Sequence, residues 1–192
     1  NPHRLQVPFG DGDLLTMPAT SVDATGTPIA GVKVVSIRNA NGELGLPTVQ
    51  SVYLLLGGKG LSPLAMIDGP ALTNLRTAAV SALATQELAR PGAASLVLFG
   101  AGAQAQAHLK ALAAVRELSG VVVVSRGQRN IEQLTALARD LGVPARTGRP
   151  EDVAEADIVC CCTTSPVPLF DGDLLAPGTH VIAVGSYRPD RR

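Results

Sequence analysis

The spacing of apolar positions changes near residue 92 of the 192-residue chain. Before it, short apolar runs are separated by segments rich in Gly and Asn, which supply the positive φ angles that tight turns require. This pattern predicts strands joined in an antiparallel β-meander. The predicted strands are residues 32–37, 49–56 and 64–67, and the separating segments are residues 39–42 and 57–60.

A helix is predicted to connect this region with the next. Pro70 suits the first helical position because its φ angle is fixed, whereas Pro91 and Gly92 cannot continue a helix. Apolar residues recur at helical spacing between these two points. We therefore expect a helix from Pro70 to just before Pro91.

From residue 93 onward, apolar strands alternate with helical patterns, which is typical of a parallel sheet covered by helices. An Ala-rich helix is expected after residue 104, and a second helix is expected to begin at Asn130 as its N-cap residue and to end at Gly142. The remaining predicted elements are strands at residues 95–99, 121–124, 144–146, 157–162 and 180–184 and a short acidic helix at residues 151–156.

Composition and charge narrow the classes of protein to consider. The 16 basic residues balance the 16 acidic ones, so no net field attracts nucleic acid or anionic lipid. No apolar stretch approaches the roughly 18 residues of a membrane-spanning helix. Three adjacent cysteines cannot form a disulfide framework, which favours a reducing compartment, and we expect a cytoplasmic protein. Because the chain opens at Asn1 and stops at Arg192, we expect it to be part of a longer polypeptide.

Residues 100–105 fit the pattern G-x-G-x-x-A between a buried strand and a helix, the context in which this pattern binds dinucleotides. Gly100 allows the tight turn, Gly102 lets the backbone approach a pyrophosphate, and Ala105 permits close helix-to-strand packing. The helix N-terminus offers free N–H groups to the phosphates. We therefore predict an α/β protein in which residues 93–192 form a Rossmann-type dinucleotide-binding domain and residues 1–92 form a mostly antiparallel β portion.

The end of the second predicted strand of this domain indicates which dinucleotide is preferred. An NAD site usually has an acidic side chain there, which accepts hydrogen bonds from the ribose. This chain has Ser125, Arg126 and Gly127 instead. The Arg126 guanidinium can pair with a 2′-phosphate, and Arg129 could add charge. We predict that NADP(H) is preferred and that NAD(H) is possible; the alternative is that Arg126 is an ordinary solvated charge.

Other chemistries find little support in the sequence. The histidines His3, His108 and His180 are far apart, with no carboxylate or cysteine at metal-ligand spacing, so we expect no metal site. His108 is expected to be a packed or solvated helix residue. Residues 160–162, all cysteine, are expected to be small apolar residues of a buried strand, a reactive thiol being the minority alternative. No histidine or nucleophile elbow accompanies Ser165 or Ser186, so hydrolysis is not expected.

Three segments together resemble the ornithine cyclodeaminase and mu-crystallin family over the whole chain. They are residues 98–105, residues 75–79 with the sequence LRTAA, and residues 183–186 with the sequence AVGS. The resemblance implies a dinucleotide-binding domain inserted into a substrate and dimerisation domain made from both chain ends. Family members extend further at both termini, so that second domain is expected to be incomplete here. A homodimer is implied for the full-length chain.

The resemblance also implies a substrate site for a small amino acid or cyclic imine carboxylate. Its carboxylate would be held by the cations Arg4, Lys33 and Arg76. Lys33 lies within an apolar strand, where a charge is rarely buried without a partner or ligand, although a solvent-facing position is the alternative. The alternative for Arg4 is an ordinary surface arginine near the terminus. The alternative for Arg76 is a salt bridge at the edge of the apolar face of its helix.

Further residues are implied as coenzyme contacts. Thr163 and Val184 would lie near the nicotinamide, and both lie at the carboxyl ends of predicted strands, where open α/β sheets bind ligands. The other implied contacts are Thr48, Arg76, Ala101, Ala103 and Gln104, with Ser125, Arg126 and Gly127 around the 2′-phosphate.

One departure from the family pattern decides between activities. Cyclodeaminases of the family have a proton-transferring aspartate where this chain has Tyr187, and Asp190 comes three residues later. The sequence therefore favours an NADPH-dependent reductase of cyclic ketimine carboxylates, such as Δ1-pyrroline-2-carboxylate giving proline. The alternatives are an ornithine or lysine cyclodeaminase using bound NAD, a non-catalytic NADPH-binding protein, and an amino-acid dehydrogenase.

Overall fold

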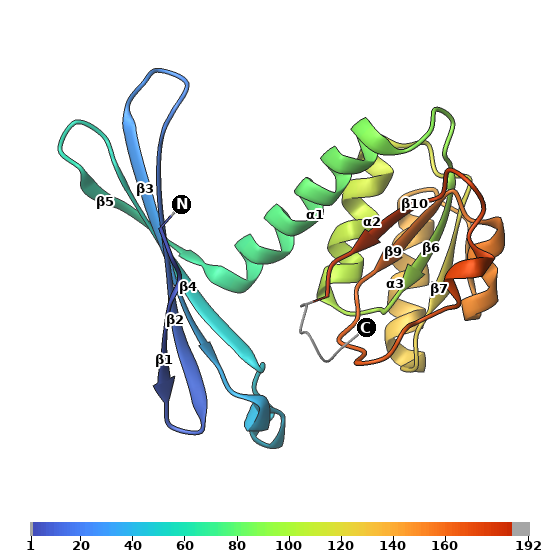
Figure 1. The fold of residues 1–192 in the computed structure, drawn as a ribbon, viewed down its shortest axis with the longest axis horizontal. Coiled ribbons are helices and arrows are strands. Elements are labelled where there is room, and N and C mark those ends of the chain that lie inside the picture. Colours follow the sequence, from blue (N-terminus) through green and yellow to red (C-terminus); the bar gives the residue numbers. More distant parts are fainter. Residues whose placement is uncertain (1, 186–192) are drawn as a thin grey trace. The chain divides into compact units, whose positions relative to one another are not determined.

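The computed structural model describes residues 2–185 and shows two compact units that meet in sequence between Thr73 and Asn74 (Figure 1). The first unit is an antiparallel sheet, and the second contains a parallel sheet with helices. Within the described part of the chain, no helix is both long and apolar enough to cross a membrane.

The first unit is a five-stranded meander in the order β1-β2-β3-β4-β5. The predicted runs correspond to the last three strands, and the two preceding strands were not predicted. Residues 39–42, expected to be a simple turn, lie in the 3-10 helix η1 (Asn39–Leu44), which ends at Gly45 with a φ angle of +67°. The strands are β1 (Leu5–Phe9), β2 (Gly12–Val22), β3 (Pro28–Ile37), β4 (Val49–Gly57) and β5 (Ser62–Asp68).

The second unit has a parallel sheet in the order β10-β9-β6-β7-β8, in which the chain reverses its direction of winding at β6. Its strands are β6 (Ser95–Phe99), β7 (Gly120–Val124), β8 (Ala145–Thr147), β9 (Ile158–Cys161) and β10 (His180–Ala183). Its helices are α2 (Ala103–Val115) and α3 (Gln128–Asp140), with short 3-10 helices η2 (Pro150–Glu155) and η3 (Gly172–Leu174).

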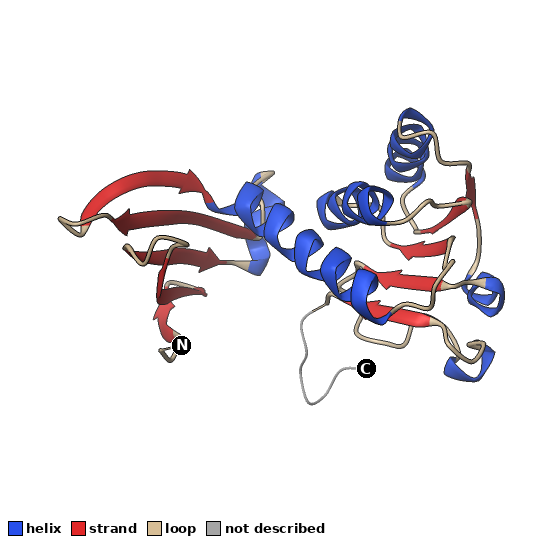
Figure 2. Ribbon diagram, turned by 90° about the horizontal axis from the view of Figure 1, so that it is seen from above, coloured by secondary structure: helices blue, strands red, loops and turns tan. Residues whose placement is uncertain are grey.

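Both faces of the parallel sheet are covered (Figure 2). On one face, Leu98 of β6 and Val123 of β7 pack against Leu109 of α2 and Leu134 of α3, all fully buried. On the other face, a second apolar cluster includes Val153 of η2 with Val97 and Val159 of the sheet. Strands buried on both faces read as continuous apolar runs, which explains why their positions were predicted closely.

Helix α1 (Gly69–Leu88) agrees with the predicted helix, but the division between the units lies within it. The sequence placed the boundary after residue 92 instead. The part of the helix from Asn74 onward belongs to the second unit, because its side chains and carbonyls form hydrogen bonds there. Ser81 lies 3.0 Å from a ring nitrogen of His108, and Arg116 donates to the Thr85 carbonyl at 2.8 Å.

Two helix predictions differ from the structure. Helix α3 begins at Gln128 with Gly127 as N-cap residue, because the amide of Asn130 already donates to the Gly127 carbonyl. Asn130 is therefore inside the helix and does not cap it. The expected acidic helix is the 3-10 helix η2, which Pro150 opens at a position where its missing N–H costs nothing.

Asp157 connects the amino end of the parallel sheet with the chain before it. Its carboxylate accepts hydrogen bonds from the amides of Ala94 at 2.8 Å and Ser95 at 2.9 Å, and it pairs with Arg90. The two amide hydrogen bonds and Arg90 hold the pKa of this carboxyl well below its usual range. The folded protein thus stabilises the ionised form of Asp157 more than its protonated form.

Replacing Asp157 by Ala is expected to lower the free energy of unfolding by about 3 kcal/mol, because two amides and a guanidinium lose a charged partner. Since the folded-state pKa is depressed, this stabilisation is fully present above the unfolded pKa of about 3.9, and it decreases progressively as the pH falls from there toward the lower folded-state pKa. Urea denaturation at pH 7 and pH 3 measures both effects. Asp140→Ala, at an exposed carboxylate, should change stability by less than about 0.5 kcal/mol; an equal loss in both variants would contradict the assignment.

Candidate functional site

The turn after β6 is shaped by a glycine that no other residue can easily replace. Gly100 has a φ angle of +92°, and a Cβ atom there would collide with the backbone carbonyl oxygen of Cys162. The Gly100 amide donates to the Val124 carbonyl at 2.8 Å, and the Cys162 amide donates to the Phe99 carbonyl at 2.8 Å. Three parallel strands therefore fix the turn at their carboxyl ends.

Gly102 serves a different purpose in the same turn. It is the N-cap residue of α2, has an extended backbone and provides no side chain to cap the helix. A Cβ atom at Gly102 would meet no heavy atom within 4 Å, so the space before the helix N-terminus is open. Three residues on, Ala105 is fully buried against the sheet. The helix N-terminus can thus be approached closely by an anion.

A hollow of about 580 Å³ lies at the carboxyl ends of β6, β7 and β9. Its volume is within the range of small-molecule sites. Arg126 is exposed and Ser125 half-buried on its rim, while the rings of Phe99 and Phe170 stack with centroids 5.3 Å apart. The lining includes Phe99, Gly100, Ser125, Arg126, Gly127, Pro150, Cys162, Thr163, Val167 and Leu169. A smaller hollow near Arg146 lies toward the other ends of the strands, where open α/β sheets do not bind ligands.

The structure thus brings Gly100, Ser125, Arg126, Gly127 and Thr163 together around one hollow, as the predicted coenzyme site requires. The other residues of this unit that the family resemblance implied lie at the start of α2 and at the end of β10. Buried Ala101 precedes the cap, exposed Ala103 begins α2, and half-buried Val184 follows β10 with its amide donating to the Cys161 carbonyl at 3.1 Å.

Gln104 and Arg76 do not line the hollow; Gln104 contacts helix α1, and Arg76 lies on that helix. The Gln104 side chain donates to the Asn74 side-chain oxygen at 2.8 Å, which connects the start of α2 to α1. Its own side-chain oxygen is buried with no hydrogen-bond partner. Arg76 is exposed on α1, two residues from Asn74.

The first unit holds the three remaining candidates, Arg4, Lys33 and Thr48. Lys33 pairs with Met17 of β2 across the sheet, and continuing the β1–β2 register by one residue places Arg4 opposite Met17. Directly opposite residues share a face, so Arg4 and Lys33 lie on the same face, two strands or roughly 10 Å apart. Thr48 is exposed just before β4, with its carbonyl bonded to the Arg38 amide.

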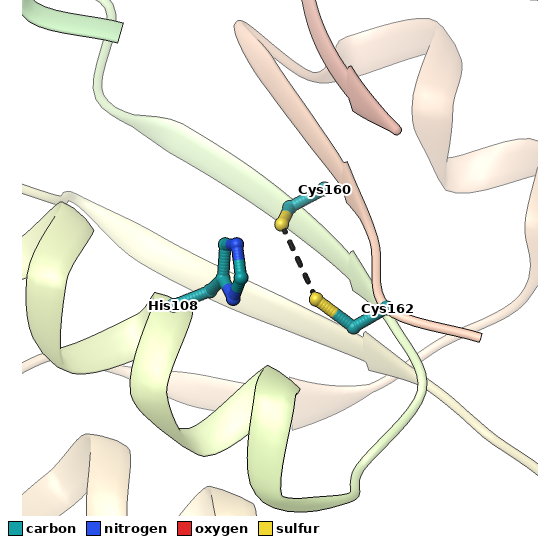
Figure 3. Close-up of side chains that lie close together, drawn as sticks. All are labelled: His108, Cys160 and Cys162. Carbon is teal, nitrogen blue, oxygen red and sulfur yellow. Dashed lines mark hydrogen bonds between the residues drawn. The ribbon is translucent and has the colours of Figure 1, made fainter. Parts of the chain in front are cut away.

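The structure also assembles a group that the sequence spacing did not reveal. His108, Cys160 and Cys162 place their potential ligand atoms within 4.8 Å of one another, and the two sulfur atoms are 3.6 Å apart (Figure 3). Cys160 and Cys161 are buried in separate apolar clusters on opposite sheet faces, as expected for strand neighbours. Cys162 differs from the expectation because it is half-buried and lines the hollow.

Hydrogen bonding within this group shifts the pKa values of its two thiols in opposite directions. The contact with Cys160 lowers the pKa of the Cys162 thiol, and His108 lowers it further against the effect of burial. The same contact and burial raise the pKa of Cys160 well above its usual range. Burial tends to lower the pKa of His108, but the Cys162 thiol and the Gln104 carbonyl outweigh burial and raise it.

The parallel sheet, the glycine turn before α2 and the hollow at the strand ends define a Rossmann-type domain. The chain belongs to the ornithine cyclodeaminase/mu-crystallin family, whose family model matches residues 1–192. Tyr187 and Asp190, on which the prediction of a reductase instead of a cyclodeaminase was based, lie outside the described residues, as does Ser186.

Named relatives agree with this assignment. A Δ1-pyrroline-2-carboxylate reductase of Bacillus cereus is 34% identical over 191 residues, which cover 98% of this chain and 58% of the relative. The reductase of the same name from Thermococcus litoralis, solved with NADH and L-proline, is 31% identical with a TM-score of 0.86 over 100% of this chain and 60% of that one. An archaeal alanine dehydrogenase dimer with bound NAD is 29% identical with a TM-score of 0.84, over 94% of this chain and 55% of that one. The chain thus spans less than two thirds of each.

Proposed function

We propose that the protein containing this chain is a nicotinamide-dinucleotide-dependent reductase of cyclic ketimine carboxylates, with Δ1-pyrroline-2-carboxylate as the substrate type and proline as the product type. The observation that carries this proposal is the hollow at the carboxyl ends of β6, β7 and β9, where Gly100, Arg126 and Thr163 meet. The Bacillus and Thermococcus reductases support the choice of substrate.

The residues present fit a dinucleotide. The open space at Gly102 would receive the pyrophosphate at the N-terminus of α2, and Thr163 would lie toward the nicotinamide end with Val184. The unpartnered side-chain oxygen of Gln104 marks a buried acceptor beside the same helix turn. When bound, the reduced coenzyme supplies the hydride that the reaction consumes.

The cations of the chain would hold the substrate carboxylate. Arg4 and Lys33 share one sheet face, and Arg76 is exposed on α1. A guanidinium grips a carboxylate through paired N–H bonds, while a lysine ammonium adds a mobile point charge. These residues would fix the position of the C=N carbon. Because a protonated iminium already accepts hydride, the chain need not provide an acid.

The proposal predicts that NADPH is oxidised when the protein containing this chain is mixed with Δ1-pyrroline-2-carboxylate. The loss of absorbance of the reduced nicotinamide measures this oxidation. Proline should form in equal amount. Release of ammonia from ornithine without net coenzyme consumption would instead indicate a cyclodeaminase. Tight NADPH binding with no turnover of imine or amino acid would indicate a non-catalytic binding protein, and either result would overturn the reductase assignment.

We further propose that NADPH is preferred to NADH, because Arg126 is an exposed cation on the rim of the hollow directly after β7. Arg126→Ala is expected to weaken NADPH binding by about 1.5 to 3 kcal/mol, or roughly 10- to 150-fold, and to leave NADH binding unchanged. Calorimetric titration of both coenzymes measures the difference. Arg139→Ala, which removes an exposed arginine at the end of α3, is the matched control; equal losses for both coenzymes would contradict the phosphate role.

We also propose a homodimer for the protein containing this chain, as in the archaeal alanine dehydrogenase. The molar mass measured by light scattering during size-exclusion chromatography tests this assembly. A monomer at micromolar concentration would contradict it.

A further inference from the structure

We propose that Cys162 is a hydroperoxide-reactive thiol and that Cys160 captures its oxidised form in a disulfide at the wall of the hollow. This site lies outside the hydride-transfer chemistry proposed above. It rests on three features of the described residues: the partial exposure of Cys162 at the hollow, the closeness of the Cys160 sulfur, and an imidazole beside both sulfur atoms.

Access distinguishes the three cysteines. Cys162 follows the end of β9, is half-buried and is one of the residues that line the 580 Å³ hollow, so a small hydroperoxide can approach this part of the chain. Cys160 is 0% exposed and lies behind it on the same sheet face. Cys161 is buried in the apolar cluster on the opposite face. Cys161 therefore can neither meet the oxidant first nor reach Cys162.

The two sulfur atoms are already close. They lie 3.6 Å apart, whereas a disulfide bond is about 2.05 Å long, so a combined movement of about 1.5 Å closes the gap. Cys162 lies just beyond the last residue of β9, where the chain leaves the sheet. A small adjustment of this segment can supply the movement.

The imidazole favours thiolate chemistry over metal binding. Both ring nitrogens of His108 already contact protein oxygen atoms, the Gln104 carbonyl at 2.7 Å and the Ser81 hydroxyl at 3.0 Å. Neither nitrogen is free to bind a metal ion without breaking one of these contacts. Figure 3 shows the ring beside the two sulfur atoms. The ring lies beside the Cys162 sulfur and lowers the pKa of this thiol, and the thiolate is the reactive form of cysteine.

The oxidation balances with a hydroperoxide as the only added reagent. The Cys162 thiolate attacks the peroxide, so that an S–O bond forms, the O–O bond breaks and water or an alcohol leaves after taking a proton. The Cys160 sulfur then attacks the sulfenic acid, forming the S–S bond as the S–O bond breaks. The departing hydroxide takes the Cys160 proton and leaves as water. Two thiols are oxidised and one hydroperoxide is reduced.

The test treats the purified protein with hydrogen peroxide and locates the products by peptide mass spectrometry. In the wild type and in Cys161→Ala, the peptide that contains residues 160–162 is expected to lose the mass of two hydrogen atoms and to regain it with dithiothreitol. Cys160→Ala is expected to stop at a sulfenic acid on Cys162, which dimedone traps. Cys162→Ala is expected to react at least about tenfold more slowly.

The proposal is overturned if Cys161→Ala forms no disulfide, if dimedone labels Cys160 in the wild type, or if Cys162→Ala reacts as fast as the wild type. Saturating NADPH is expected to slow the oxidation, because Cys162 lines the hollow in which the coenzyme is proposed to bind. This expectation rests on the proposed function. If NADPH gives no protection while the disulfide still forms, the coenzyme binds elsewhere and the thiol site stands.

Discussion

Replacing Gly102 by Val is expected to lower the affinity for NADPH at least about 100-fold while the fold is kept. The Cβ and methyl groups would fill the open space before α2, where the proposed pyrophosphate must approach the helix N-terminus. Exclusion of the phosphates removes several charge-assisted hydrogen bonds together, each of about 1.5 to 3 kcal/mol. Calorimetric titration with NADPH measures the loss.

A matched variant separates this effect from a general effect of added side-chain volume. Gly172 begins η3, is also free of heavy atoms within 4 Å of a Cβ position, and does not line the hollow. Gly172→Val should bind NADPH as the wild type does. Thermal denaturation should show both variants folded, because a poor N-cap residue costs only about 1 kcal/mol. Unchanged NADPH affinity in Gly102→Val would exclude the helix N-terminus as the coenzyme site.

Replacing Gly100 by Ala is expected to destabilise the second unit by about 4 kcal/mol. The φ angle of +92° is unfavourable for any residue with a Cβ, and that Cβ would collide with the Cys162 carbonyl, which belongs to rigid backbone. Relief of the collision would separate β6 from the chain after β9. Urea denaturation followed by circular dichroism measures the change in the free energy of unfolding.

Gly142 provides the control for the backbone conformation alone. Its φ angle is +75°, but no heavy atom lies within 4 Å of its Cβ position. Gly142→Ala should therefore cost only the conformational penalty of about 1 to 2 kcal/mol. If the two variants are equally stable, the collision with Cys162 does not contribute and the turn is more adaptable than the structure indicates.

The parallel sheet could be predicted from the sequence because its strands are covered on both sides. Residues 95–99 were predicted with the bounds of β6, since every position there is apolar or small. The strands β1 and β2 escaped prediction because they mix polar residues, Pro8 and Pro18 with apolar ones, and β1 is exposed throughout. The alternation in β1 covers only five residues and contains a proline, and β2 has neither a continuous apolar run nor a clean alternation, so neither strand gives a strong periodic signal.

The candidate site was predictable to the extent that its parts are contiguous. The turn from Gly100 and the segment at Arg126 each occupy a few adjacent residues, and both line the hollow. The group of His108 with Cys160 and Cys162 could not be found in this way, because a helix and a strand far apart in sequence bring it together. The position of Cys162 at the carboxyl end of a predicted strand was the available signal, one residue before Thr163.

The shared row of Arg4, Met17 and Lys33 has a consequence for how the length of this chain can vary. One residue added within β1, between Arg4 and the turn that leads into β2, would turn Arg4 toward the opposite side of the sheet and leave Lys33 where it is. Two added residues would restore the original orientation. Viable insertions and deletions along this hairpin should therefore come in even numbers, a parity rule imposed by pleating and invisible in the chemistry of either cation.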